Sequence, residues 1–262
     1  PVFMVNGNHE QAAAYLLDGT PNNVAVWAQN ARNSHYSQPA PDGFYSGNTV
    51  PVPFVGLLRN YFAWTWGDAL FVVLDAYRYQ SVDGTSEKPK SWDWTLGKKQ
   101  YDWMRSTIEG SKAKYKFVFA HHIRGQDRGA LTNAKLYEWG GYDGDGKTYS
   151  FDKNRPGWGK PIHQIFKDSG VTIFFQGHDH IFCTQERDGL IYQSMPNPAD
   201  DTFSMFNSDA YKSGVKAPNS GHVRVTVAPS QAKVEYFLAA RSKDTDRKNM
   251  SLAHSYIVKP KV

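Results

Sequence analysis

Residues 171–180 read VTIFFQGHDH. The first five of them are a nearly continuous apolar run, which is typical of a strand buried on both faces of a sheet. At Gly177 the run changes into a polar loop that carries His178 and His180, two positions apart. A buried strand followed at once by such a loop indicates an α/β fold, because the loops at strand ends of these folds collect ligand-binding groups. Gly177 lacks a Cβ, which favours close approach of the chain to another group.

Strands and helices alternate along much of the chain. The strongly patterned segments are a strand at 61–66, a strand at 70–74, a helix at 96–108, a strand at 115–120 and a helix at 161–170. The two strands closest in sequence flank Gly67-Asp68, a dipeptide that suits a tight antiparallel turn. The pattern predicts two packed sheets with helices outside and no linker between independent domains.

The two ends of the chain differ from the middle. Residues 1–5 are apolar and predict a short strand, and the alanine-rich residues 10–17 predict a helix. Residues 18–53 predict a long irregular loop. Residues 223–238 alternate apolar and polar positions, which predicts a half-exposed hairpin, and residues 256–258 predict a last strand.

Composition excludes several classes of protein. The 262 residues contain no apolar run near the roughly 18 residues that a membrane span needs. The 30 basic residues are scattered among 25 acidic ones, so the net charge of +5 predicts a mild preference for anions and no specific nucleic-acid binding. Cys183 is the single cysteine, so no intrachain disulfide forms, and we expect a packing role for it. The many Trp, Tyr, Asn and Gly residues favour an extracellular or periplasmic protein.

Three histidine clusters follow predicted strands. They are Gly7-Asn8-His9-Glu10, Val118-Phe119-Ala120-His121-His122 and Gly177-His178-Asp179-His180. Neutral imidazole is the commonest protein ligand for zinc and also suits iron. Each cluster alone has a structural explanation: a turn, a hydrogen-bonded histidine pair, or a solvated turn around Asp179. Their joint occurrence at strand ends indicates a metal site.

In this order, the three clusters resemble the third, fourth and fifth sequence blocks of the calcineurin-like metallophosphoesterase superfamily, which includes the purple acid phosphatases. Residues 61–75, 96–124 and 155–193 resemble secreted bacterial members in general. The resemblance implies a four-layer α/β/β/α sandwich of two mixed β-sheets flanked by helices. It also implies that residues 1–262 are the C-terminal two thirds of one such domain, incomplete at the N-terminus.

The resemblance also implies roles for individual residues. Asn8, His121 and His178 would bind one metal ion, and His180 would bind another. The cofactors would be two divalent or trivalent transition metal ions, iron, manganese or zinc. The activity would be hydrolysis of small phosphate monoesters or diesters by a water that bridges the two metals.

Three further residues would face the substrate. His9 would be catalytic, lying beside the phosphate to stabilise charge or protonate the leaving oxygen. His122 and Arg124 would contact the substrate, although an ordinary surface role is open for both.

The sequence departs from the family pattern in one respect. The two earlier blocks, which supply a bridging Asp and other carboxylates, do not occur in residues 1–262, and Gly67-Asp68 and Gly144-Asp145-Gly146 are more consistent with turns. Neutral Asn and His ligands cannot balance two metal ions alone. We therefore expect that a missing N-terminal segment is needed to complete the site. The alternatives are a catalytically incomplete binding module and a mononuclear zinc hydrolase that uses His121, His178 and His180.

Overall fold

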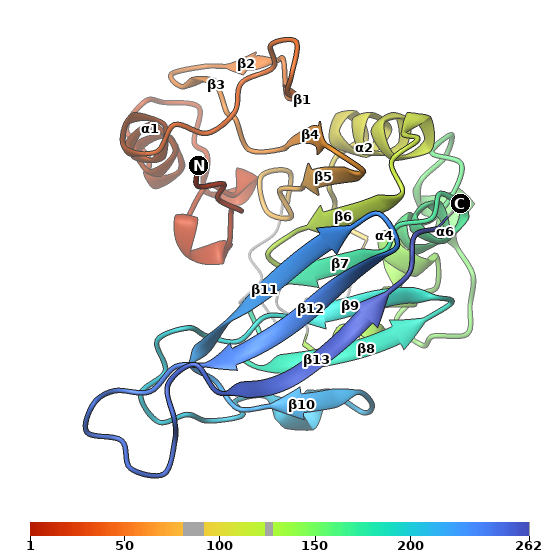
Figure 1. The fold of residues 1–262 in the computed structure, drawn as a ribbon. Coiled ribbons are helices and arrows are strands. Elements are labelled where there is room, and N and C mark those ends of the chain that lie inside the picture. The colour runs from red at the N-terminus through yellow and green to blue at the C-terminus, as the bar shows by residue number, and fades with distance from the viewer. Residues whose placement is uncertain (81–91, 124–127, 262) are drawn as a thin grey trace.

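The computed structural model describes residues 1–80, 92–123 and 128–261. Within these residues the main sheet has the strand order β1-β4-β5-β6-β7-β9-β8-β10 (Figure 1). Its strands are β1 (Ser46–Gly47), β4 (Phe62–Trp66), β5 (Ala69–Val73), β6 (Tyr115–Phe119), β7 (Ile173–Gln176), β8 (Phe182–Arg187), β9 (Leu190–Ser194) and β10 (Val215–Ala217). The predicted strands 61–66, 70–74, 115–120 and 171–175 are confirmed.

The centre of the main sheet is parallel. Strands β5, β6, β7 and β9 run in the same direction, with Phe71 beside Phe117, Phe117 beside Ile173, and Ile173 beside Ile191. The predicted hairpin is also present, since β4 and β5 pair antiparallel. The carboxyl ends of β6 and β7 therefore lie next to each other, and so do the loops that follow them.

Helices cover one face of the main sheet. They include α2 (Lys98–Gly110), α4 (Tyr137–Gly140) and α6 (Ile162–Asp168). Met104 of α2 and Phe166 of α6 are fully buried in one cluster with Val118 and Phe174 of the sheet. The helices predicted at 96–108 and 161–170 are thus confirmed. The segment between β6 and α6 also contains α3 (Leu131–Ala134) and α5 (Phe151–Asn154). None of the described helices combines the length and apolar character that crossing a bilayer requires.

A second sheet packs on the other face. It consists of β11 (Gly221–Ala228), β12 (Gln231–Leu238) and β13 (Leu252–Val258), and Figure 1 shows it in front of β6 to β9. Ala232 and Val234 of β12 pack against Tyr115 and Phe117 of β6. The predicted α/β sandwich is confirmed. The second sheet is antiparallel throughout, and alternate residues of β11 and β13 are exposed, so the described layers are helices, main sheet and second sheet.

Cys183 lies on β8 and is fully buried. Burial raises the pKa of its thiol to about 12. This environment fits the packing role expected from the sequence.

The start of the chain differs from the prediction. Residues 1–5 pair with no strand in the described part of the chain, so the predicted strand is wrong. Instead, the Phe3 ring stacks on Trp64 with 4.2 Å between ring centroids, and the Met4 backbone N–H donates to Gln38 Oε1 at 2.8 Å. An apolar run becomes a strand only where a neighbouring strand accepts its backbone hydrogen bonds.

The predicted helix at 10–17 is also wrong. The chain there forms two short 3-10 turns, η1 (Asn8–Glu10) and η2 (Ala14–Leu16), because Gln11 adopts a left-handed conformation with φ of 51°. A full helix, α1 (Val24–His35), forms within the segment predicted to be irregular. The side chain of Asn23 caps it by accepting from the Val26 N–H at 3.1 Å. A small ladder, β2 (Pro51–Val52) with β3 (Gly56–Leu57), follows.

Candidate metal centre

Three side-chain atoms from distant parts of the chain meet at one point. Asn8 Oδ1 lies 3.0 Å from His121 Nε2 and 3.1 Å from His178 Nδ1. The two histidine nitrogens are 3.2 Å apart. We call these atoms the donor triangle. Three of the four predicted metal ligands therefore lie together.

The size of the donor triangle fits a metal ion. Ligand atoms about 2.1 Å from a metal, at about 90–100° to each other, lie about 3.0–3.2 Å apart. The three edges of the triangle, 3.0, 3.1 and 3.2 Å, fall in this range. An amide oxygen and two imidazole nitrogens are also a chemically suitable set for zinc, manganese or iron.

Parallel pairing of β6 and β7 places the two histidines. His121 follows β6 and His178 follows β7, and the Gly177 N–H donates to the His121 carbonyl at 3.0 Å, which joins the two loops. His178 has a φ of 65° and His180 a φ of 52°. Left-handed backbone at two non-glycine residues stores strain, which is common at functional sites.

Gly7 allows Asn8 to approach His121. A Cβ on Gly7 would lie 2.8 Å from both Cε1 and Nδ1 of His121, so only glycine fits without movement. A Cβ on Gly177 would lie 3.5 Å from His121 Nδ1, which is an ordinary contact. The expectation that Gly177 is the position needing a missing Cβ is therefore wrong, and Gly7 has that role.

Both histidines of the triangle are neutral near pH 7. Burial and, after it, repulsion from His9 and His180 together lower the pKa of His121 to about 4. Burial and, after it, electrostatic interaction with His121, Arg128 and the other nearby histidines lower the pKa of His178 to about 3. A neutral imidazole keeps the lone pair that a metal ion needs.

His9 and His180 lie on the solvent side of the triangle. Both side chains are exposed, and both act electrostatically on His121 and His178. The His180 ring is 6.2 Å from the Phe206 ring. Among the described residues, neither His9 nor His180 makes a hydrogen bond to a triangle atom. His180 is thus near the other three predicted ligands but does not join them.

His122 lies behind the triangle. Its side chain is 1% exposed, its ring centroid is 4.4 Å from that of His178, and its Nε2 is 3.7 Å from Asp179 Oδ1. The structure thus buries the His122 side chain, and its contact with the substrate stays a prediction. Arg124 lies outside the described residues.

Asp179 lies on the buried side of the donor triangle and follows His178 in the sequence. It is fully buried, and its Oδ2 accepts from the Tyr211 hydroxyl at 2.6 Å and from the Gly129 N–H at 3.0 Å. The alternative of a solvated turn is wrong. Burial raises the pKa of Asp179, while the Tyr211 hydrogen bond opposes that shift. Arg128 lies 3.8 Å from Asp179 Oδ1 and donates to the His178 carbonyl at 3.3 Å.

A second group of possible ligand atoms overlaps the first. His122, His178 and Asp179 offer atoms that lie within 4.8 Å of one another, and all three are buried. Because this group shares His178 with the donor triangle, we regard it as the support of the triangle rather than a separate site. Sequence reasoning missed Tyr211 and Gly129, since both come from irregular segments with no motif.

No family model and no curated protein matches the chain. Among solved structures it is similar to PhoD, with a TM-score of 0.60 and 17% identity over 96% of this chain and 52% of PhoD. It is also similar to the purple acid phosphatase PPD1 from yellow lupin (Lupinus luteus) seeds, with a TM-score of 0.50 and 15% identity over 97% of this chain and 40% of that one. The chain therefore spans about half of PhoD and less of the lupin enzyme. At these identities the likenesses show a shared fold.

Proposed function

We propose that this chain belongs to a metal-dependent phosphoesterase that hydrolyses monoesters or diesters of small phosphorylated molecules. The observation that carries the proposal is the donor triangle of Asn8, His121 and His178, whose edges fit one metal ion. The fold shared with PhoD and a purple acid phosphatase supports the same activity. An extracellular or periplasmic location is part of this proposal and rests on composition.

In this proposal each residue has a distinct task. Asn8, His121 and His178 hold one metal ion, and the exposed His180 contributes to a second. Bound metals would supply an activated water and neutralise the phosphate oxygens. His9, exposed beside the triangle, meets the phosphate and donates a proton to the leaving oxygen. Burial keeps His121 and His178 deprotonated, so no proton has to leave before a metal binds.

The donor triangle predicts that further, negatively charged ligands are needed. Asn8 and the two histidines are neutral ligands, and two cations require carboxylates for charge balance. Asp179 is held by Tyr211 and Gly129 on the buried side. We therefore propose that an N-terminal segment carries the bridging carboxylate and completes the second metal site. Adding upstream sequence to this chain should raise the bound metal from about one to about two per chain.

The geometry favours this arrangement over a mononuclear zinc site. The mononuclear alternative uses His121, His178 and His180, and makes Asn8 dispensable. Asn8 Oδ1 lies within 3.1 Å of both histidine nitrogens, whereas His180 has no such contact in the described residues. A binding module without hydrolysis would keep the triangle but show no turnover.

The test is to measure metal affinity and hydrolysis in matched variants. In protein that carries the upstream segment, Asn8→Ala should weaken Mn²⁺ or Zn²⁺ binding by at least about tenfold and abolish hydrolysis of p-nitrophenyl phosphate and its diester. Asn22→Ala removes an exposed amide elsewhere and should change neither. Wild-type metal affinity in Asn8→Ala would refute the triangle as a metal site. Tight metal binding without hydrolysis, even with the upstream segment added, would support the binding module.

A further inference from the structure

A second charged site lies at the opposite end of the main sheet. It is a cleft of about 780 Å³ at the amino ends of β6 and β7. We call it the lysine cleft, because five lysines line it: Lys112, Lys114, Lys116, Lys167 and Lys261. The donor triangle follows the carboxyl ends of the same strands. A strand of five residues, such as β6, separates the two sites by roughly 16 Å.

Lys116 fixes a positive charge in the wall of this cleft. It is only 7% exposed, and its Nζ donates to the Ile108 carbonyl at 3.0 Å and to the Ser169 carbonyl at 2.7 Å. These carbonyls lie at the ends of α2 and α6. Burial lowers the pKa of Lys116, and repulsion from Lys112 lowers it further. The ammonium is thus held by neutral groups and has no carboxylate partner among the described residues.

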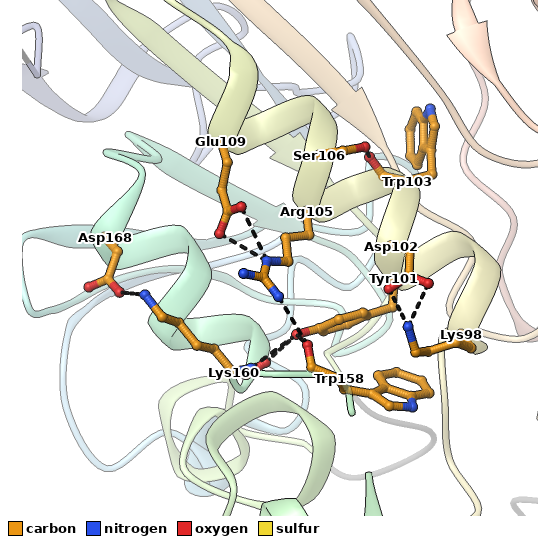
Figure 2. Close-up of polar contacts among 10 residues, drawn as sticks. All are labelled: Lys98, Tyr101, Asp102, Trp103, Arg105, Ser106, Glu109, Trp158, Lys160 and Asp168. Carbon is orange, nitrogen blue, oxygen red and sulfur yellow. Dashed lines mark hydrogen bonds and ion pairs between the residues drawn. The ribbon is translucent and has the colours of Figure 1, made fainter. Parts of the chain in front are cut away.

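The acidic residues that line the cleft do not cancel its charge. Glu109 forms an ion pair with Arg105 at 3.0 Å, and Asp168 forms one with Lys160 at 2.6 Å. Both pairs are drawn as dashed lines in Figure 2. Each acid is therefore already paired with a cation outside the lysine cleft. The cleft keeps a net positive charge.

Most of the five lysines form no ion pair with a described residue. Lys114 forms an ion pair with Asp68 at 3.0 Å. Lys261 donates to the Val171 carbonyl at 2.8 Å and the Gly189 carbonyl at 2.6 Å, which positions its charge without neutralising it. Lys112 and Lys167 are exposed and have no ion pair with any described residue. Four of the five ammonium groups therefore have no carboxylate partner among the described residues, and the exposed Lys112 and Lys167 can reach an anion directly.

We propose that the lysine cleft binds a condensed inorganic phosphate, such as pyrophosphate or tripolyphosphate. Ammonium groups act as point charges and bind phosphate without requiring a planar partner. The volume of about 780 Å³ exceeds what a single phosphate would fill. The described residues that line the cleft include no aromatic ring and no arginine, so a nucleobase would find none of them to stack on. This site is independent of the proposed hydrolytic activity.

Isothermal titration with tripolyphosphate at low ionic strength tests this inference. Wild-type protein treated with a chelator should show saturable binding that weakens as salt is added. The double variant Lys112→Ala/Lys167→Ala should lose at least about tenfold in affinity. Lys243→Ala/Lys248→Ala makes the same charge change at an exposed loop and should bind like wild type. Asn8→Ala should also bind like wild type, because the donor triangle is not involved.

Each of three results would overturn the inference. The first is the absence of saturable binding by wild-type protein. The second is equal affinity in the two double-lysine variants, which would mean that net charge alone attracts the anion. The third is loss of binding in Asn8→Ala, which would place the anion at the donor triangle. Circular dichroism of every variant verifies that the fold is intact.

Discussion

Replacing Gly7 with Ala is the most direct perturbation of the donor triangle. Gly7 has φ of −111° and ψ of −176°, an extended conformation that alanine adopts without strain. The backbone can therefore accept the change. The new methyl group, however, would lie 2.8 Å from two ring atoms of His121 and 2.9 Å from Glu10 Oε2.

The size of the effect follows from these distances. Ordinary contacts of a Cβ begin at 3.4 Å, so the His121 ring must move by about half an ångström or more. His121 Nε2 would then leave its positions 3.0 Å from Asn8 Oδ1 and 3.2 Å from His178 Nδ1. Misplacing a ligand in this way typically costs about 10–100-fold in metal affinity. Crowding a packed site also costs about 1–3 kcal/mol of stability.

The assay is competition for Zn²⁺ with a chromogenic chelator, together with urea unfolding of the metal-free protein. Gly177→Ala is the matched control, because its Cβ would lie 3.5 Å from the same ring, at ordinary contact distance. We expect a large loss of affinity for Gly7→Ala and less than about threefold for Gly177→Ala. Equal losses in both variants, or none in Gly7→Ala, would refute the steric reasoning.

Three further variants test other parts of the structure by urea unfolding. Tyr211→Phe should cost about 1.5–3 kcal/mol because buried Asp179 loses its 2.6 Å hydrogen bond; a loss below about 0.5 kcal/mol would contradict this. Arg155→Ala should cost about 3–5 kcal/mol by leaving buried Glu138 unpaired, and adding Glu138→Gln should recover part of the loss. Burial lowers the pKa of His163 below its ordinary 6.5. As the pH drops below about 6.5, His163 therefore takes up a proton more readily in the unfolded chain than in the folded protein, and the free energy of unfolding falls. His163→Gln should flatten that decline between pH 7 and 5, and an unchanged slope would count against it.

The central sheet could be predicted because its strands are buried on both faces. Residues 115–120 and 171–175 read as nearly continuous apolar runs, and both form strands within a residue or two of the prediction. The run at 1–5 looks similar, but the described structure offers it no neighbouring strand. Pattern alone cannot supply a partner. Helix α1 was missed because Gln29 and Arg32 are among its buried residues, so its inner face shows no apolar periodicity.

The candidate site was predictable only in part. Asn8, His121 and His178 follow strand-like runs, and the sheet topology brings His121 and His178 together. The direction of a side chain is set by local backbone angles, so the sequence could not show that His122 turns inward. The contact between Tyr211 and Asp179 joins positions 32 residues apart, with β8 and β9 between them, and no spacing rule encodes it.

Asn8 differs from the two histidines in the secondary structure that holds its backbone in place. His121 and His178 extend from strands locked into the sheet, whereas Asn8 sits on a short 3-10 turn in a segment without strand pairing. In the proposed site, a metal ion bound by the three atoms would also tie the first residues of the chain to the rest of the protein, in addition to the contacts of Phe3 and Met4. Ligand capture and ordering of that segment are then one coupled equilibrium, so chelation should expose the segment to proteases before the sheet itself loosens.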